Sequence, residues 1–321
     1  MKEQGLYYPD GSFKTKEQLC ERVVFPDKKK RGDVFSETVA IIRQTRELHE
    51  KFEIGQTEAT WRPQVAHPEL PLMLDCMTDP HFGSSKSNID LLVDHLDLVE
   101  ETDNFTIITD GDDVDNFNAT GKWASGMMED PLPPQVQGRA WVERMKKLDD
   151  KGKIGVMGFG NHNDFGEQAG WDWYDTFLGG FKCPVFTSGG LLKVEYGNQT
   201  YQIALTHRYW GTSKLNPTNA CKRYLEHEYP DADVVMLGHT HQSEGLHFER
   251  GGKDRIGLIG GTFKDKDTFA RKRGIGGRSG APGWVLALWP DRRQMQLFKD
   301  IDVAKSSFEG WKRYKECGGR V

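Results

Sequence analysis

The feature that most restricts the fold of this sequence is a series of short apolar runs that each end in polar side chains. These runs are far shorter than the ~20 residues of a membrane-spanning helix, and their length is typical of buried strands. The clearest of them cover residues 70–77, 105–109, 153–157, 200–206 and 232–237. Residues 88–98 and 136–148 lie between them and have the apolar spacing of helices. This alternation of strand, loop and helix predicts a layered α/β fold.

Further pairs of apolar segments predict β-hairpins at residues 191–206, 246–259 and 284–299, each pair joined by turn residues. The chain before residue 69 differs from the rest, because it is rich in charge and poor in apolar runs. One helix is expected there, at residues 36–52. We therefore divide the chain into an N-terminal extension at 1–68, a main domain at 69–300 and a C-terminal tail at 301–321.

The polar clusters at the ends of the predicted strands consist of side chains that bind divalent metal ions. Because ligands bind at the carboxyl ends of strands in open α/β sheets, we expect these clusters to form one site. The mixture of carboxylate, imidazole and amide oxygen suits manganese, iron or zinc better than magnesium, which prefers carboxylates and water. The set is larger than one ion needs, so we expect two ions that share a bridging carboxylate. Its members are Asp79 with His81, Asp112 with Asp115, Asn161 with His162, His207, and His239 with His241.

Five motifs contain these residues and follow one another in a fixed order. They are Asp-x-His at residues 79–81, Gly-Asp-x-x-Asp at 111–115, Gly-Asn-His at 160–162, a lone His at 207, and Gly-His-x-His at 238–241. Their order and their placement at strand ends resemble the calcineurin-like metallophosphoesterase superfamily, over residues 70–299. The resemblance implies a layered α/β/β/α sandwich of two mixed sheets with flanking helices, and a metal site at the carboxyl ends of the strands.

The resemblance also implies a role for each site residue. The metal ligands would be Asp79, His81, Asp112 and His241 for one ion, and Asp112, Asn161, His207 and His239 for the other. His162 would act as the general acid, and Asp115 would orient its imidazole. Two such ions clamp a phosphate and lower the pKa of a bound water, so that a metal-bridging hydroxide attacks phosphorus. Manganese is the expected metal, with iron, zinc, nickel, cobalt and magnesium as alternatives.

The implied activity is the hydrolysis of phosphate esters, and the sequence departs from the family pattern at two places. Asn163 stands where the family has an acid after Gly-Asn-His, with Asp164 one residue later. Asn116 and Phe117 stand where the Ser/Thr phosphatases have Arg-Gly, which disfavours that branch. Phosphodiesterases, nucleases and small-molecule phosphatases remain as candidates.

Two segments bear on the substrate. Residues 264–278 contain six basic and two acidic residues with interleaved glycines, and such a segment either follows a phosphate backbone or is a solvated loop. Between residues 112 and 161 lie apolar side chains that either stack on bases or pack in the core, and we favour the core: Trp123, Met127, Met128 and Trp141. The basic segment and the N-terminal extension favour a phosphodiesterase or nuclease that acts on DNA, RNA or nucleotides. A phosphomonoesterase, acting on a small molecule or a protein through the same metal centre, is the alternative.

Composition bears on the other classes of protein. The 43 Lys and Arg against 48 Asp and Glu give a net charge of -5, which argues against a surface that attracts nucleic acid everywhere. The five cysteines are scattered, and no apolar signal segment follows the first residues, so we expect a cytoplasmic protein without membrane association.

Two other classes of function are disfavoured by the sequence. A non-catalytic binding protein should have lost metal ligands, and none is missing. A DNA-binding regulator acting through residues 1–68 is disfavoured, because that segment shows no clear helix-turn-helix.

Overall fold

The computed structural model describes residues 35–36, 38–44, 57–116, 130–163, 165, 179–213, 215–265, 283–319 and 321. The chain divides into two compact units, Met1–Ile54 and Gly55–Val321. In the first unit the described residues, 35–36 and 38–44, are helical. They overlap the helix predicted at residues 36–52, whose other residues lie outside the described part of the chain.

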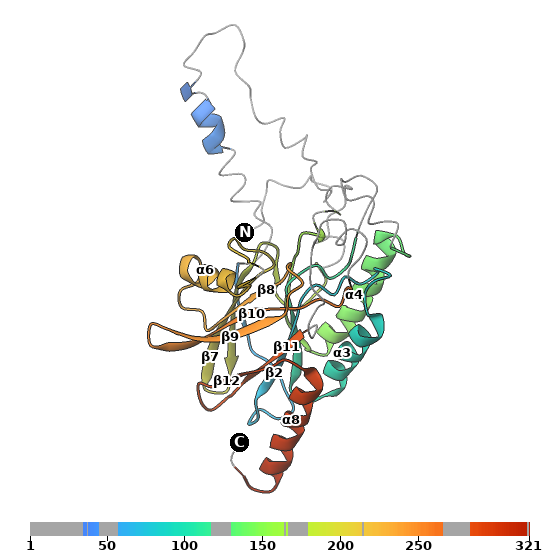
Figure 1. The fold of residues 1–321 in the computed structure, drawn as a ribbon, viewed down its shortest axis with the longest axis vertical. Coiled ribbons are helices and arrows are strands. Elements are labelled where there is room, and N and C mark those ends of the chain that lie inside the picture. Colours follow the sequence, from blue (N-terminus) through green and yellow to red (C-terminus); the bar gives the residue numbers. More distant parts are fainter. Residues whose placement is uncertain are drawn as a thin grey trace, which may run out of the picture. The chain divides into compact units, whose positions relative to one another are not determined.

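The described part of the second unit contains two mixed sheets of six strands each (Figure 1). One sheet has the order β1-β6-β7-β8-β10-β9. Its strands are β1 (Glu58–Trp61), β6 (Gly190–Tyr196), β7 (Gln199–Thr206), β8 (Val234–Leu237), β10 (Lys253–Ile259) and β9 (Glu244–Arg250). The other sheet has the order β12-β11-β2-β3-β4-β5. Its strands are β12 (Met295–Phe298), β11 (Gly283–Leu288), β2 (Leu72–Met77), β3 (Phe105–Thr109), β4 (Ile154–Gly158) and β5 (Val185–Phe186).

The two sheets face each other across an apolar layer and carry helices on their outer faces. Residues such as Leu74 and Val156 of the second sheet meet Val194, Ile203 and Met236 of the first in this layer. The second sheet is covered by α3 (Ile89–Glu101), α4 (Pro134–Asp150) and α8 (Ile301–Glu316), and the first by α6 (Asn219–His227) (Figure 1). The predicted α/β/β/α sandwich is therefore confirmed. Among the described helices, none combines the length and the apolar composition needed to cross a membrane.

The sequence explains why the elements next to the site form where they do. β2, β3 and β4 are buried along their whole length between helices and the other sheet, which accounts for their continuous apolar runs. α3 begins where the side chain of Asn88 accepts a hydrogen bond from the Leu91 amide at 3.2 Å. Its residues Leu92, Leu96 and Val99 then lie on one face and are buried.

The sandwich extends beyond the predicted limits of residues 69–300 at both ends. β1 pairs in parallel with β6 and so belongs to the first sheet, although residues 1–68 are predicted as an extension. α8 lies in the predicted tail, yet it buries Ile301, Ala304 and Phe308 in the core. Its first turn is capped by Asp300, which accepts a hydrogen bond from the Val303 amide at 3.0 Å. Both elements are integral because each covers apolar surface that would otherwise be exposed.

A substitution of Phe308 can test whether α8 is part of the core. It is 0% exposed, and its ring meets that of Phe105 edge to face, with centroids 6.0 Å apart. Phe308→Ala should lower the free energy of unfolding by about 3–5 kcal/mol, because it leaves a cavity in a packed layer. Chemical denaturation measures this change. The control substitution is Val303→Ala, at an exposed position of the same helix. It should change the free energy of unfolding by less than about 0.5 kcal/mol. Equal effects of the two substitutions would contradict the assignment.

Candidate metal centre

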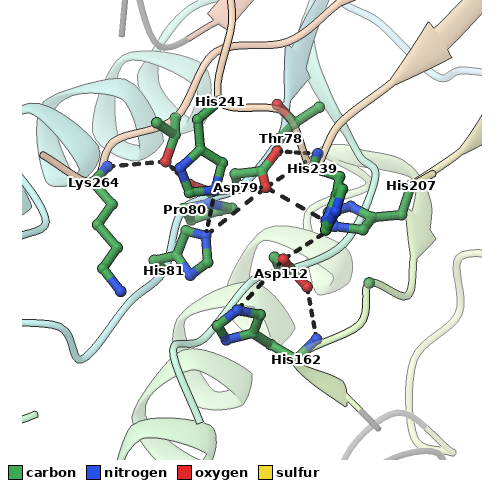
Figure 2. Close-up of polar contacts among 12 residues, drawn as sticks. Thr78, Asp79, Pro80, His81, Asp112, His162, His207, His239, His241 and Lys264 are labelled. Carbon is green, nitrogen blue, oxygen red and sulfur yellow. Dashed lines mark hydrogen bonds and ion pairs between the residues drawn. The ribbon is translucent and has the colours of Figure 1, made fainter. Parts of the chain in front are cut away.

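Five loops meet at the carboxyl ends of five strands. Three of the loops follow β2, β3 and β4 in one sheet, and two follow β7 and β8 in the other. The structure thus brings together side chains from both sheets that are far apart in the sequence. Figure 2 shows the residues whose side chains point toward one another there: Asp79, His81, Asp112, His162, His207, His239 and His241.

The backbone of this site takes a conformation that side chains normally avoid. Among the described residues, seven other than glycine have positive φ, and five of these belong to the site, with φ between 47 and 68°. They are Asp79, His81, Asp112, His239 and His241. Such a conformation costs about 1–3 kcal/mol per residue and persists only where the surroundings impose it. Hydrogen bonds between loops do so here, from the Asp79 amide to the Gly111 carbonyl at 3.2 Å and from the His81 amide to the Asp112 carbonyl at 3.0 Å.

Asp112 lies at the centre of the site because two loops approach each other very closely. A Cβ atom at Gly111 would collide with the backbone of Gly160, and one at Gly160 would collide with the Asp112 carboxylate. The His162 amide donates a hydrogen bond to Asp112 Oδ1 at 2.8 Å. The other oxygen, Oδ2, lies 3.0 Å from His207 Nε2 and 3.8 Å from His162 Nε2. One carboxylate is therefore shared by side chains from several loops.

The predicted ligands form two groups of three, within each of which the ligand atoms lie within 4.8 Å of one another. The first group is Asp79, His81 and His241, and the second is Asp112, His207 and His239. In the first group His241 Nε2 lies 3.3 Å from Asp79 Oδ1 and 3.0 Å from His81 Nε2. A third group, His81, Asp112 and His162, overlaps both. Asp112 thus reaches side chains of both groups, as a bridging carboxylate must.

The residues present fit two divalent ions. Asn161 Oδ1 is buried and has no hydrogen-bond partner, which is costly for a polar atom unless a ligand satisfies it. Asn161 precedes His162, whose amide donates to Asp112 Oδ1 at 2.8 Å, so its loop adjoins the cluster. Carboxylate, imidazole and amide oxygen together form a donor set for manganese, iron or zinc. These side chains could be held by the fold before any ion binds, because strand ends fix all five loops.

Three site histidines have their outer ring nitrogen Nδ1 occupied by an acceptor outside the cluster. His207 Nδ1 donates to the Asp110 carbonyl at 2.6 Å, and His162 Nδ1 donates to the Asp115 carbonyl. His81 Nδ1 lies 2.8 Å from Asp115 Oδ1. Each contact favours the tautomer with the proton on Nδ1, which leaves Nε2 to face the cluster. This is the arrangement that metal-binding imidazoles require.

Asp115 therefore acts differently from the prediction. It was expected to orient His162 with its carboxylate, but the nearest carboxylate oxygen lies 3.9 Å from His162 Nδ1, and the backbone carbonyl makes the contact instead. The carboxylate is taken up by His81 and by Lys264, whose Nζ lies 2.7 and 2.8 Å from its two oxygens. Lys264 escaped prediction because the sequence places it in a basic run, where nothing distinguishes it from solvated lysines.

The protonation of the metal-free site follows from burial and from the neighbouring charges. Burial lowers the pKa of His81 to about 4, and burial together with the charge of His207 lowers that of His239 to about 4. Burial also acts to lower the pKa of His207, but the charges of Asp112 and Asp79 outweigh it and raise that pKa to about 10. Burial opposes ionisation of Asp112, yet the nearby histidines hold its pKa well below the usual range.

A further carboxyl group adjoins this network. Burial and the negative charge of Asp115 raise the pKa of Asp130 to about 8, and the two carboxyl groups share a hydrogen bond. Gln137 also donates to Asp130, from Nε2 to Oδ2 at 3.1 Å. Asp130 therefore carries a proton at neutral pH, which limits the negative charge beside Asp115.

The substrate-binding features predicted from the sequence are only partly described. Residues 266–278 of the basic segment lie outside the described residues, as do Trp123, Met127 and Met128. Trp141 is 2% exposed within α4, as expected for core packing. For Lys264, the prediction of a basic loop is wrong, because this residue is 6% exposed and its ammonium group is bound to Asp115.

Neither a family model nor a curated protein matches the sequence. Some solved structures are similar to the structure of this chain. Vacuolar protein sorting 29 from Cryptosporidium parvum is 13% identical with a TM-score of 0.38, over 72% of this chain and 100% of that one. A putative 5'-nucleotidase from Staphylococcus aureus, in complex with alpha-ketoglutarate, is 12% identical with a TM-score of 0.43, over 75% of this chain and 58% of that one. A predicted phosphoesterase from Streptococcus pneumoniae is 15% identical with a TM-score of 0.29, over 71% and 97%. The resemblance to the calcineurin-like metallophosphoesterases rests instead on the fold and on the five motifs that it brings together.

The raised pKa of His207 leads to a prediction about the pH dependence of metal binding. At pH 7 the imidazole is protonated in the metal-free protein, so it must lose a proton before Nε2 can bind an ion. The apparent affinity for Mn²⁺ should therefore increase between pH 6 and pH 8, by about tenfold per pH unit for each proton released. Isothermal titration calorimetry in two buffers with different ionisation enthalpies counts these protons. His207→Asn should abolish the pH dependence that comes from this group. Identical heats in both buffers for the unmodified protein would contradict the assignment.

Proposed function

We propose that this chain is a phosphoesterase that binds two divalent metal ions, preferably manganese, and hydrolyses phosphodiester bonds of nucleic acids or nucleotides. The observation that carries the proposal is the pair of ligand groups that meet at Asp112. When bound, two such ions supply positive charge to a phosphoryl oxygen and lower the pKa of a bound water.

The residues of the chain prepare the site for this reaction. Asp112 joins the two ligand groups, while the Asp110 carbonyl and the Asp115 carboxylate hold His207 and His81 with Nε2 turned inward. Asp79 Oδ1 and Oδ2 accept hydrogen bonds from the His239 amide at 3.2 and 2.9 Å, which fixes the carboxylate of one group against the loop of the other. Both groups are therefore held in position relative to each other by the protein itself.

His162 is suited to donate a proton to the leaving oxygen. Its Nδ1 is held by the Asp115 carbonyl, and its Nε2 lies on the side of Asp112 Oδ2, at 3.8 Å. The ring is 9% exposed, so it borders the cluster and also reaches its surface. A protonated imidazole placed there can protonate an alkoxide as the phosphorus–oxygen bond breaks.

The preference for a phosphodiester is supported by positive charge near the site. Arg208 follows His207 and is exposed. Burial lowers the pKa of His239, and the charge of Arg208 is the last of the contributions to the same shift. The Arg208 guanidinium can neutralise a phosphate oxygen of the substrate. The basic residues of the sequence at 266–278 add charge of the kind that binds a polyanion.

A panel of substrates in the presence of defined metals tests the proposal. We expect bis-p-nitrophenyl phosphate to be hydrolysed faster than p-nitrophenyl phosphate with added Mn²⁺, and activity to be lost in chelator. Single- and double-stranded DNA, RNA and cyclic nucleotides then identify the natural class of substrate. Faster turnover of the monoester would favour the phosphomonoesterase, and full activity without bound metal would exclude the proposal.

Two variants serve as controls in the same assays. Asp112→Ala should lose both ions by elemental analysis, because its carboxylate serves both groups. His241→Ala should retain more metal, since it belongs to the first group only. Equal metal content in the two variants would contradict the bridging role of Asp112.

His162→Ala separates proton donation from metal binding. The variant should keep both ions while kcat falls by about 10²–10⁴-fold on an alkyl or nucleotide ester, whose leaving oxygen needs a proton. The loss should be much smaller on a p-nitrophenyl ester, because p-nitrophenolate leaves without one. Metal content is measured in the same samples. Loss of an ion, or an equal loss on both esters, would show that His162 is instead a ligand or a phosphate-binding group.

A further inference from the structure

Lys264 is a buried lysine attached to the backbone of the first metal-binding loop. It follows β10 and is 6% exposed. The preceding residues Thr262 and Phe263 bond to the Asp79 carbonyl, through Thr262 Oγ1 at 2.8 Å and the Phe263 amide at 3.3 Å. Lys264 itself forms an antiparallel bridge with Ser87, whose hydroxyl donates to the His81 carbonyl at 2.7 Å. The position of Lys264 is thus tied to that of Asp79 and His81 (Figure 2).

The ammonium group of Lys264 points at a carboxylate that contacts a predicted metal ligand. Its Nζ lies 2.7 and 2.8 Å from Oδ1 and Oδ2 of Asp115, which is 1% exposed. Asp115 Oδ1 also lies 2.8 Å from His81 Nδ1. His81 Nε2, on the opposite side of the ring, lies 3.0 Å from His241 Nε2 and 3.8 Å from Asp79 Oδ1. A continuous chain of polar contacts therefore runs from Lys264 through Asp115 and His81 into the first ligand group.

The charges explain why this chain needs a cation at its outer end. Asp79, Asp112 and Asp115 are each at most 1% exposed, and a buried carboxylate is strongly destabilising unless a cation or hydrogen bonds compensate it. Asp115 lies behind His81, where an ion bound at Nε2 does not contact it. Lys264 supplies the compensation on that side and keeps the Asp115 carboxylate in place, with Oδ1 2.8 Å from His81 Nδ1. Carboxylates that orient metal-binding imidazoles in this way typically change metal affinity by 10–100-fold when they are removed.

We propose that Lys264 is a positioning residue of the metal centre, which holds the Asp115 carboxylate so that His81 keeps its proton on Nδ1 and presents Nε2 to one of the two ions. The proposal rests on the proposed function only for the presence of that ion. The orientation and tautomer of His81 belong to the metal-free protein as well. Lys264 is thereby assigned to the metal centre and not to the recognition of a phosphate backbone.

The test compares Lys264→Met with Lys264→Arg and with a matched control. Lys153→Met is the control, because Lys153 is half-buried and donates to the carbonyls of Thr102 and Phe105 at 2.6 and 3.2 Å, next to the amino end of β4 and away from Asp115. Titration calorimetry with Mn²⁺ should show one of the two binding events weakened by about 10–100-fold in Lys264→Met. Lys264→Arg should restore most of that affinity, and Lys153→Met should leave it unchanged.

A second measurement reads the tautomer of His81 directly. Nitrogen-15 NMR of the metal-free protein, with the His81 signals assigned through His81→Gln, should show Nδ1–H as the main form in the unmodified chain. Lys264→Met should reduce that fraction, whereas Lys153→Met should not. If the unmodified protein bound no metal, the proposed function would fail, and this measurement alone would decide the role of Lys264.

A double variant tests whether Lys264 acts through Asp115. In the Asp115→Asn background, adding Lys264→Met should change neither metal affinity nor the His81 tautomer by more than about twofold, since the carboxylate it holds is gone. This pair remains informative if Lys264→Met alone does not fold, because the double variant leaves no unpaired charge at this position. Additive losses in the double variant would overturn the proposal. Unchanged affinity and an unchanged tautomer in Lys264→Met would overturn it as well.

Discussion

The structure of the centre depends on holding several carboxylates together where water has little access. Asp79 and Asp112 are at most 1% exposed and belong to adjoining ligand groups, so they repel each other unless positive charge lies between them. In the metal-free protein a protonated His207 provides it, 3.0 Å from Asp112 Oδ2. A divalent ion held by Asp112, His207 and His239 would supply a larger positive charge than this proton.

The sandwich is what makes such a cluster possible. One ligand group depends on loops from both sheets, since Asp79 and His81 follow β2 while His241 follows β8. The apolar layer between the sheets fixes their relation, and a site built on the ends of rigid strands keeps its geometry better than one on long loops. Left-handed backbone at five of the predicted site residues turns their side chains inward after β2, β3 and β8. The energy that this conformation costs is offset by the packing of the layers and by hydrogen bonds between the loops.

The sequence predicted the parts of this structure that leave a periodic or local signal. The strands next to the site are buried on both faces, so their apolar runs and polar ends are visible in the sequence. β1 leaves no such signal, because it has four residues that alternate between exposed and half-buried. α8 buries only Ile301, Ala304 and Phe308 among many charged residues. Lys264 is harder still, because its role depends on Asp115, which is brought to it only by the packing of the two sheets.

The two departures from the family motifs lie in different loops, after β3 and after β4, and the structure gives each a physical role. Asn163 Oδ1 accepts a hydrogen bond from the Gly160 amide at 2.8 Å, so an amide closes the turn at the position where the family has an acid. Asn116 Nδ2 donates to the His162 carbonyl at 2.7 Å, from the position where the Ser/Thr phosphatases have arginine. Both side chains therefore hold the backbone around His162. An arginine at position 116 would offer positive charge to a substrate, whereas this asparagine is 0% exposed and faces the loop.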